Sequence, residues 1–241
     1  MKVWMILMAC LMICPIVHAQ STQKLLTSGQ DYFDRGEYKK ALNAFEKLLK
    51  KAPDVADYYV NRGLTKEELG NTNGAIDDYS KALQLDSNLS TAWECRASLY
   101  AKLKRFDEAI SDFDKAIESN GKRAMLYHGR GLAKYKSGRA QEAIVDFSMA
   151  IDMAPDFIES YYIRAFAKMS QKQYESAIGD IDKMIEAKPT YGGAYLTKAK
   201  CLGELKRYAE AFQYCEMARD RGYKEEAEKL RKLLKEKKDQ D

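Results

Sequence analysis

Residues 90–123 read STAWECRASLYAKLKRFDEAISDFDKAIESNGKR, and this stretch recurs with substitutions along most of the chain. Its alanine at position 109 has counterparts at one fixed interval of 34 residues in both directions. The full series is Ala41, Ala75, Ala109, Ala143, Ala177 and Ala211. An interval of that length is typical of helix–turn–helix units that stack on one another. The sequence therefore predicts an array of helical pairs without a single compact core.

Other positions repeat in phase with these alanines. In five of the six copies a bulky residue follows the alanine by four places, as at Phe113, and in all six a small residue precedes it by twelve, as at Ala97. Small residues let two helices approach closely, and the bulky side chain fills the space beside their crossing. Pro53, Pro155 and Pro189 share one place in their copies. Because proline cannot continue a helix, they indicate where one pair ends.

The order aromatic, small, tyrosine, alanine, aromatic, alanine resembles the tetratricopeptide repeat, and its fullest copy here is Trp93, Ala97, Tyr100, Ala109, Phe113 and Ala116. The resemblance covers about residues 22–223, in six units that start near Thr22, Ala56, Ser90, Ala124, Ile158 and Gly192. It implies an all-α fold, namely a right-handed α-solenoid of six units over residues 20–223 and a C-terminal capping helix with a charged tail over 224–241. The departures are Ser87, Gly121 and Tyr223 in place of the closing proline, and Cys215 in place of the second aromatic residue.

The last segment, 224–241, carries one apolar stripe formed by Ala227, Leu230, Leu233 and Leu234. Such a stripe predicts an amphipathic helix that covers the exposed face of the sixth unit. A basic helix on a membrane surface is the alternative, and four glutamates in the same segment count against it.

The first nineteen residues differ in composition from the rest. Lys2 is their one charged side chain, an apolar run follows over residues 3–17, and Ala19 offers a small residue before a polar start at Gln20. This layout is typical of a secretory signal peptide over 1–19. The run is shorter than the ~20 residues that span a bilayer. An uncleaved membrane anchor and a lipidated Cys10 are the alternatives. We expect an exported protein, either periplasmic or secreted.

Two sets of charged residues also recur at the 34-residue interval. The first is Arg62, Arg96, Arg130 and Arg164, and the second is Asp78, Asp112, Asp146 and Asp180. One interpretation is a structural ladder of partly buried ion pairs, since a guanidinium and a carboxylate can pair through two hydrogen bonds. The other is a row of arginines that binds an acidic partner in the groove. The first unit has Ser28 and Ala44 at these two places, and this joint absence favours pairing within a unit.

The sequence lacks the residues that catalytic sites need. His128 is the one histidine after residue 19, so a histidine-based metal cluster or catalytic triad has no further members. No glycine-rich phosphate loop is present. A net charge of +4, with 32% charged residues of both signs interspersed, does not favour nucleic-acid binding. We expect no enzyme activity, no metal, no cofactor and no small-molecule substrate.

Three cysteines follow the first nineteen residues: Cys95, Cys201 and Cys215. Cys201 and Cys215 fall on the two helices of the last unit, where they could face each other. Two interpretations stay open, a disulfide between these two residues or two small buried thiols.

The resemblance implies that the first helix of each unit lines the concave side of the array. The side chains on that side that we expect to bind a partner are Phe33, Leu64, Met125, His128, Leu132, Tyr135, Tyr162, Phe166 and Met169. Aromatic rings on a rigid helix offer contact area at low entropic cost, and methionine adapts to irregular partners. The alternative is that several of them pack against neighbouring units. Leu26, Val60 and Glu94 stand where some family members have the polar residues that bind a chaperone tail.

These features together predict a non-enzymatic protein–protein interaction scaffold that binds a peptide or protein segment in the concave groove. We expect its setting to be a bacterial envelope, where it acts as an exported adaptor or assembly factor. A self-associating structural scaffold and an accessory subunit of a membrane assembly or secretion complex are the alternatives. The identity of the partner and the oligomeric state do not follow from the sequence.

Overall fold

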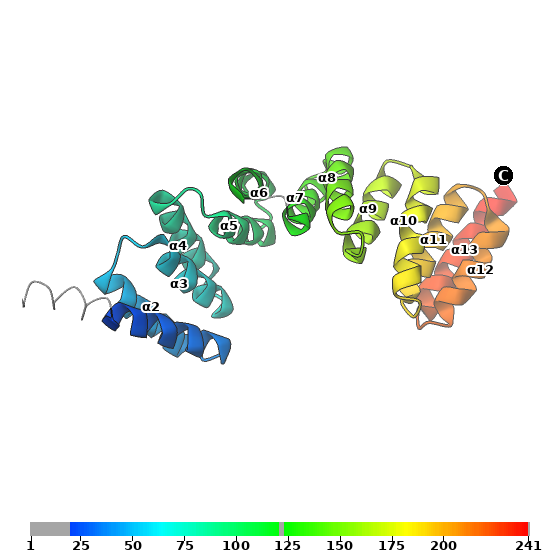
Figure 1. The fold of residues 1–241 in the computed structure, drawn as a ribbon. Coiled ribbons are helices and arrows are strands. Elements are labelled where there is room, and N and C mark those ends of the chain that lie inside the picture. The colour runs from blue at the N-terminus through cyan, green and yellow to red at the C-terminus, as the bar shows by residue number, and fades with distance from the viewer. Residues whose placement is uncertain (1–19, 121–122, 241) are drawn as a thin grey trace, which may run out of the picture. The chain divides into compact units, whose positions relative to one another are not determined.

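The regular elements of the structure, a computed structural model that describes residues 20–120 and 123–240, are all helices (Figure 1). This confirms the all-α fold class expected from the sequence. The segment expected to be a signal peptide, 1–19, lies outside the described residues. No helix within the described ranges combines the length and the apolar character needed to span a lipid bilayer.

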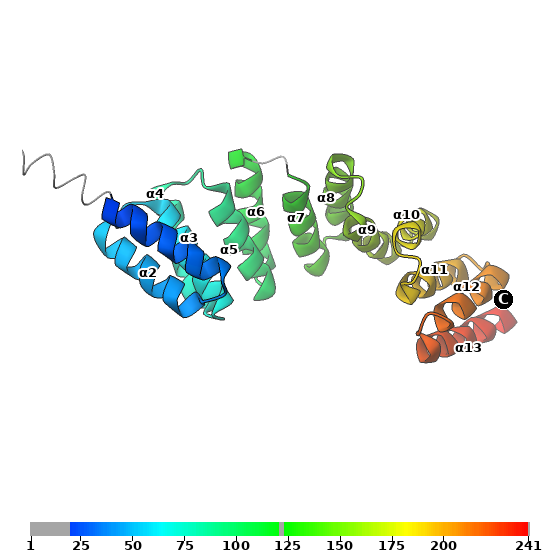
Figure 2. The same ribbon diagram turned by 60° about the horizontal axis from the view of Figure 1, so that its bottom comes forward.

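Contacts between residues divide the chain into two units, which we describe separately: an N-terminal unit up to Gly121 and a C-terminal unit from Lys122. The N-terminal unit holds a helix over 20–34, α2 Tyr38–Lys51, α3 Ala56–Glu68, α4 Thr72–Leu85, α5 Ser90–Lys102 and α6 Phe106–Asn120. The C-terminal unit holds α7 Ala124–Lys136, α8 Ala140–Met153, α9 Ile158–Ser170, α10 Tyr174–Ala187, α11 Gly192–Glu204, α12 Tyr208–Arg219 and α13 Lys224–Gln240. Helices that follow one another in a unit pack side by side (Figures 1 and 2).

The recurring small residues lie at the centre of each helical pair. All six alanines of the series that includes Ala41 are 0% exposed. At Gly63, a Cβ atom would lie 2.7 Å from Cε1 of Tyr79, so the ring of the second helix occupies the space that a side chain on the first would need. The interval read from the sequence is thus the interval of the helix crossings.

The turn inside each pair is the same in all six copies. Its key residue has a positive φ, between 59° and 88°, and is Gly36, Gly70, Lys104, Gly138, Lys172 or Lys206. Glycine adopts this conformation without strain, whereas the three lysines carry the steric cost of a Cβ atom. The shared geometry lets each second helix return along its first.

The turn between two pairs can close without proline. Pro53, Pro155 and Pro189 lie in such turns, but Ser87 stands at this place after the second pair. Here the indole N–H of Trp93 donates to the Ser87 carbonyl at 2.8 Å, and the backbone N–H of Asn88 donates to the Asp86 carboxylate at 2.9 Å. These two hydrogen bonds hold the segment that proline holds elsewhere.

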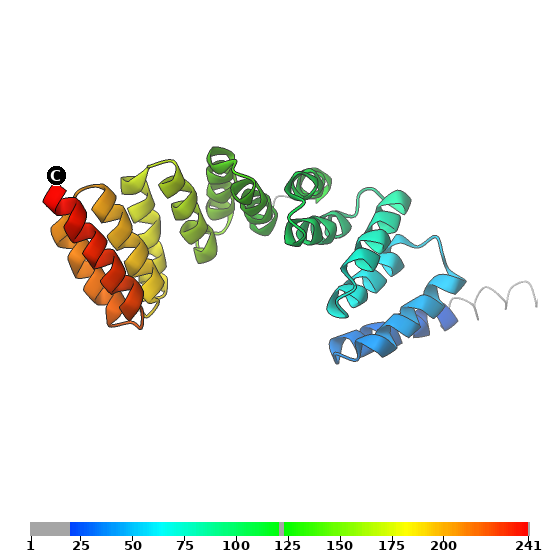
Figure 3. The same ribbon diagram turned by 180° about the vertical axis from the view of Figure 1, so that it is seen from behind.

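Helix α13 covers the last pair, as its apolar stripe indicated. Ala227, Leu230 and Leu234 are buried, and α13 lies beside α12 (Figure 3). The expectation for Leu233 was wrong, because this side chain is 49% exposed. With 3.6 residues per turn, the Leu233 side chain lies about 90° around the helix axis from the mean direction of the three buried residues.

Candidate functional site

The recurring arginines and aspartates form ion pairs between the two helices of a pair. Arg62 donates to the Asp78 carboxylate through Nε at 2.8 Å and through one terminal nitrogen at 2.6 Å. Arg96 with Asp112, Arg130 with Asp146 and Arg164 with Asp180 repeat this two-point geometry. The hydrogen bond to Asp78 raises the pKa of Arg62.

Two of these guanidinium groups also contact the preceding helical pair. The third nitrogen of Arg96 donates to the Ser80 hydroxyl of the preceding pair at 2.8 Å, and that of Arg164 donates to Ser148 at 2.9 Å. The face of each guanidinium lies over the ring three residues earlier, for example that of Trp93 under Arg96 at 4.8 Å. Arg96 and Arg164 thus join neighbouring helical pairs, and the contacts of all four guanidinium groups suit a structural ladder and leave little of them for a partner.

We call each of these four Arg–Asp ion pairs a rung. In three of the four rungs a lysine also contacts the aspartate. Lys66 lies 2.8 Å from Asp78, Lys134 lies 2.9 Å from Asp146, and Lys168 lies 2.8 Å from Asp180. The Arg96–Asp112 rung has Tyr100 at this place, and its ring lies 5.7 Å from the Arg96 guanidinium. These lysines were not among the residues expected from the sequence, although multiples of 34 residues separate them.

An open hollow lies on the first-helix side of the C-terminal unit. We call it the C-terminal hollow; its volume is about 490 Å³, and it is lined by Tyr135, Phe166, Met169, Ser170, Tyr174, Lys200, Glu204, Leu230, Leu233, Leu234 and Lys237. Three of the predicted partner-binding residues therefore lie around one space. The exposed Leu233 is part of its wall, so α13 contributes to the hollow as well as covering the core.

The polar groups of the C-terminal hollow are unevenly paired. Lys237 contacts Glu204 at 2.6 Å. Lys200 is exposed and has no ion-pair partner among residues 20–120 and 123–240. The hollow thus combines an apolar floor with a free positive charge, a combination that binding sites use to orient a ligand.

The N-terminal unit has a smaller open hollow on its own first-helix side. Its volume is about 370 Å³, and its lining residues are Gln30, Asp31, Phe33, Asp34, Phe45, Asn61 and Leu64. Phe33 and Leu64, both predicted partner-binding residues, thus share this space. Its charged groups are carboxylates, so it differs in sign from the C-terminal hollow.

The other four predicted partner-binding residues line neither hollow. The Tyr162 hydroxyl lies 3.3 Å from that of Thr197, and its ring meets those of Phe166 and Tyr191 edge-on. His128 packs against the following pair, and Leu132 is half-buried. Met125 is 57% exposed and stands apart from the hollows.

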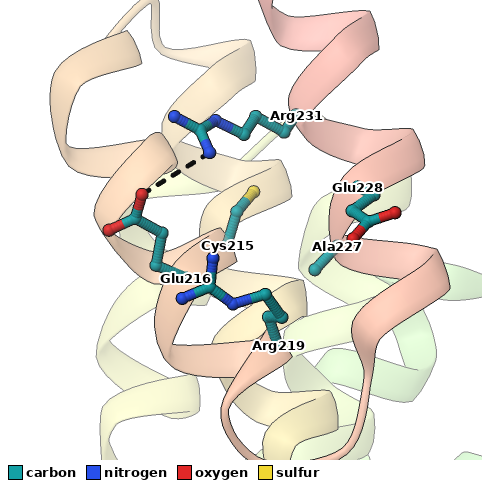
Figure 4. A pocket seen from close by; sticks show the side chains of 6 residues that line it. All are labelled: Cys215, Glu216, Arg219, Ala227, Glu228 and Arg231. Carbon is teal, nitrogen blue, oxygen red and sulfur yellow. Dashed lines mark ion pairs between the residues drawn. The ribbon is translucent and has the colours of Figure 1, made fainter.

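Cys201 and Cys215 are free, buried thiols. Burial raises the pKa of Cys201 to about 12 and that of Cys215 to about 11, so neither thiol is ionised at neutral pH. Figure 4 shows Cys215 between α12 and α13, near the ion pair of Arg231 with Glu216 at 3.5 Å. The cavity beside it holds about 20 Å³, room for about one water molecule.

The described residues contain no group of three or more histidine, cysteine or acidic side chains that could hold a metal ion. The geometry of the site is therefore that of helix pairs, ion-pair rungs and open hollows.

Comparison with known proteins agrees with this geometry. A family model described as tetratricopeptide repeat matches residues 26–90, and a second model with the same description matches residues 90–122. Residues 26–122 thus match tetratricopeptide repeats. The repeats of the C-terminal unit lie beyond these two matches and have the same turn and the same rungs. No curated protein matches the chain.

Several solved structures are similar to this chain along most of its length. One is YrrB, "a TPR protein with an unusual peptide-binding site", with 19% identity, a TM-score of 0.73, and coverage of 78% of this chain and 98% of that one. Another is MamA, with 24% identity, a TM-score of 0.67, and coverage of 72% and 94%. A tetratricopeptide repeat protein from Parabacteroides merdae has 25% identity, a TM-score of 0.59, and coverage of 91% and 85%. These likenesses support the solenoid fold class.

Proposed function

We propose that this chain is a non-enzymatic scaffold that binds a peptide or protein segment on the first-helix side of its repeats. The observation that carries the proposal is the C-terminal hollow, where side chains from three first helices and from α13 surround about 490 Å³. A groove of this size and apolar character suits several side chains of a bound segment.

The walls of the C-terminal hollow are preorganised for binding. The Phe166 ring is held edge-on by Tyr162 at 4.9 Å between ring centres, so little side-chain freedom is lost when a partner covers it. Tyr135 and Met169 are half-buried, which leaves part of each available for contact. Lys200 would pair with an acidic group of the bound segment and so fix its direction.

We further propose that the scaffold acts as an exported adaptor or assembly factor of a bacterial envelope. The support for this setting is the sequence of residues 1–19, with its single positive charge, short apolar run and small residue at Ala19. The peptide-binding site named for YrrB belongs to that protein, and it supports the same class of function here.

A selection experiment tests the proposed function. A displayed peptide library is selected on the full chain, and the best peptide is titrated against the wild type, Phe166→Ala and Tyr135→Ala. We expect each variant to weaken binding by about tenfold or more, because both residues lie in the walls of one hollow. Leu103→Ala is the matched control, since Leu103 is 43% exposed in the N-terminal unit and lies outside the hollow. Equal affinity of all four proteins would place the binding site elsewhere.

Self-association is the second candidate function, and one observation favours it. Val145 and Met149 are 56% and 39% exposed, four residues apart on α8. The place of Met149 holds a lysine in four other repeats, as at Lys81, Lys115 and Lys183, and Met217 in the sixth. Light scattering of the full chain separates the two functions, since a mass that rises with concentration, and that Met149→Lys reduces to that of one chain, would support self-association.

A further inference from the structure

A cluster of lysines surrounds a third hollow, at the start of the N-terminal unit. We call it the lysine hollow; its volume is about 480 Å³, and its lining residues are Ser21, Lys24, Leu25, Ser28, Lys47, Lys50 and Lys51. The helix over 20–34 and α2 supply all of them. No carboxylate is among the lining residues.

The lysine hollow exists because the first repeat lacks a rung of the ladder. Ser28 occupies the place that Arg62 and Arg96 hold in the next two repeats, and Leu25 occupies the place of Tyr59 and Trp93. In those repeats the guanidinium lies over the ring, at 5.5 Å in one and 4.8 Å in the other. The two shorter side chains of the first repeat leave this space open.

The charges around the lysine hollow are unbalanced. Its four lysines are exposed, and none of them forms an ion pair within the residues that the structure describes. One of them, Lys51, donates to the Ser21 hydroxyl at 2.6 Å. Four like charges around one space repel one another, and an anion that enters it relieves this repulsion.

We propose that the lysine hollow binds the anionic headgroups of phospholipids and so attaches the N-terminal unit to a membrane surface. The charge selects an anion, and the apolar floor formed by Leu25 and the lysine stems suits the glycerol and upper acyl region beside a phosphate. The space is larger than a single free phosphate fills. This surface differs from the C-terminal hollow, so the proposal does not depend on peptide binding there.

The lining of the lysine hollow favours a membrane over another polyanion. It combines four lysines with the apolar surface of Leu25 and of the lysine stems, which a soluble polyanion would leave in contact with water. Lysines attract an anionic leaflet, and each contributes about fivefold to membrane partition. The mixed charges of the remaining chain give no comparable surface for nucleic acid.

Lysine footprinting of the full chain tests the proposal without depending on residues 1–19. The chain is acetylated briefly in the presence of phosphatidylglycerol–phosphatidylcholine vesicles, of pure phosphatidylcholine vesicles, or of inorganic phosphate alone. The acetylated fraction of each lysine is then quantified by mass spectrometry. We expect Lys24, Lys47, Lys50 and Lys51 to be protected by severalfold with the anionic vesicles only, and less so at high salt. Lys232, Lys235 and Lys238, exposed on α13, serve as internal controls.

Two variants separate the shape of the hollow from its charge. Replacing its four lysines by glutamine should lower partition to the anionic vesicles by about tenfold or more. Ser28→Arg with Ala44→Asp keeps the net charge, adds the missing rung and fills the hollow. We expect this double variant to lose the protection while its circular dichroism spectrum stays that of the wild type.

Three results would overturn the proposal. Equal protection with neutral and anionic vesicles would show that charge does not select the ligand. Protection by inorganic phosphate alone would make the ligand a soluble anion. Wild-type protection in a folded Ser28→Arg, Ala44→Asp variant would show that the headgroup does not enter the hollow.

Discussion

His128 is the residue whose charge state has the clearest consequence for the C-terminal unit. Its Nδ1 lies 2.8 Å from the Ser160 hydroxyl oxygen, and its ring packs against Phe157 at 4.6 Å and Phe147 at 5.6 Å. Burial lowers the pKa of His128, and the nearby charge of Glu159 opposes this only in part. The folded protein therefore favours the neutral imidazole.

This predicts a loss of stability in mild acid. An unfolded histidine titrates near pH 6.5, above the folded pKa, so the unfolded chain binds more protons as the pH falls below that value. The contribution of neutral His128 is fully present above about pH 6.5 and declines as the pH falls toward the folded pKa. Urea unfolding of the wild type and of His128→Gln at pH 7.5 and pH 5.5 measures this contribution to the free energy of unfolding. We expect the stability difference between the two proteins to be larger at the higher pH, and a pH-independent difference would contradict the assignment.

At the residue scale the sequence predicted more about packing than about exposure. The 34-residue interval located the buried alanines and the paired charges because each repeat places these residues in the same surroundings. The same interval could not tell that Tyr162 and His128 contact the next repeat while Phe166 and Tyr135 face an open hollow. That distinction depends on the sizes of the neighbouring side chains, here Thr197, Tyr191 and Phe157.

Pairs of helices are held in register by the Arg–Asp rungs. The aspartates are nearly inaccessible, for example 5% exposed at Asp112 and 1% at Asp146, while their arginines keep some contact with water. Removing the carboxylate charge leaves these cations without a partner inside the array.

We expect Asp146→Asn to cost about 2–4 kcal/mol of unfolding free energy. Asp112→Asn should cost less, because Asp146 pairs with both Arg130 and Lys134 whereas Asp112, among the described residues, pairs with Arg96 alone. The measurement is urea unfolding followed by circular dichroism. Asp77→Asn, an exposed change next to a rung, is the control and should have an effect near zero. Equal, negligible changes for all three variants would rule out a stabilising ladder.

The sequence predicted the presence of helix α13 but not the angle at which it packs. Its amphipathic pattern predicted a helix that covers the last pair, and the buried Ala227, Leu230 and Leu234 agree with it. The pattern could not give the angle at which α13 packs on α11 and α12. This angle is set by Gly203, where an added Cβ would lie 2.2 Å from a methyl group of Leu234. The close approach leaves Leu233 on the wall of the C-terminal hollow.

The whole molecule has two units, each with hydrophobic clusters of its own. In the N-terminal unit one cluster surrounds Tyr79 and another surrounds Phe45. In the C-terminal unit one cluster extends from Ala165 to Leu234, and further buried residues such as Phe147 lie outside it. In arrays of repeats, stability arises from each repeat and its nearest neighbours, so a local change has local effects.

We expect Gly63→Ala to raise amide hydrogen exchange in the N-terminal unit and to leave that of the C-terminal unit unchanged. The added Cβ would lie 2.7 Å from the Tyr79 ring, which costs about 1–2 kcal/mol after ring displacement. The control is Gly179→Ala on α10, where a Cβ meets nothing within 4 Å. This change should slow exchange locally, since alanine favours the helix by up to about 1 kcal/mol. A uniform rise across both units after Gly63→Ala would show that they unfold together.

The hydrogen bond from Trp93 to Ser87 has a spectroscopic consequence. Trp93 is the one tryptophan after residue 19, and its indole is fixed on the turn that closes the second repeat. The C-terminal unit contains tyrosines and no tryptophan. Fluorescence excited at the red edge therefore reports on the first half of the chain alone, whereas tyrosine emission follows both halves. The protein carries a built-in optical label with which the melting of one half can be watched without attaching a dye.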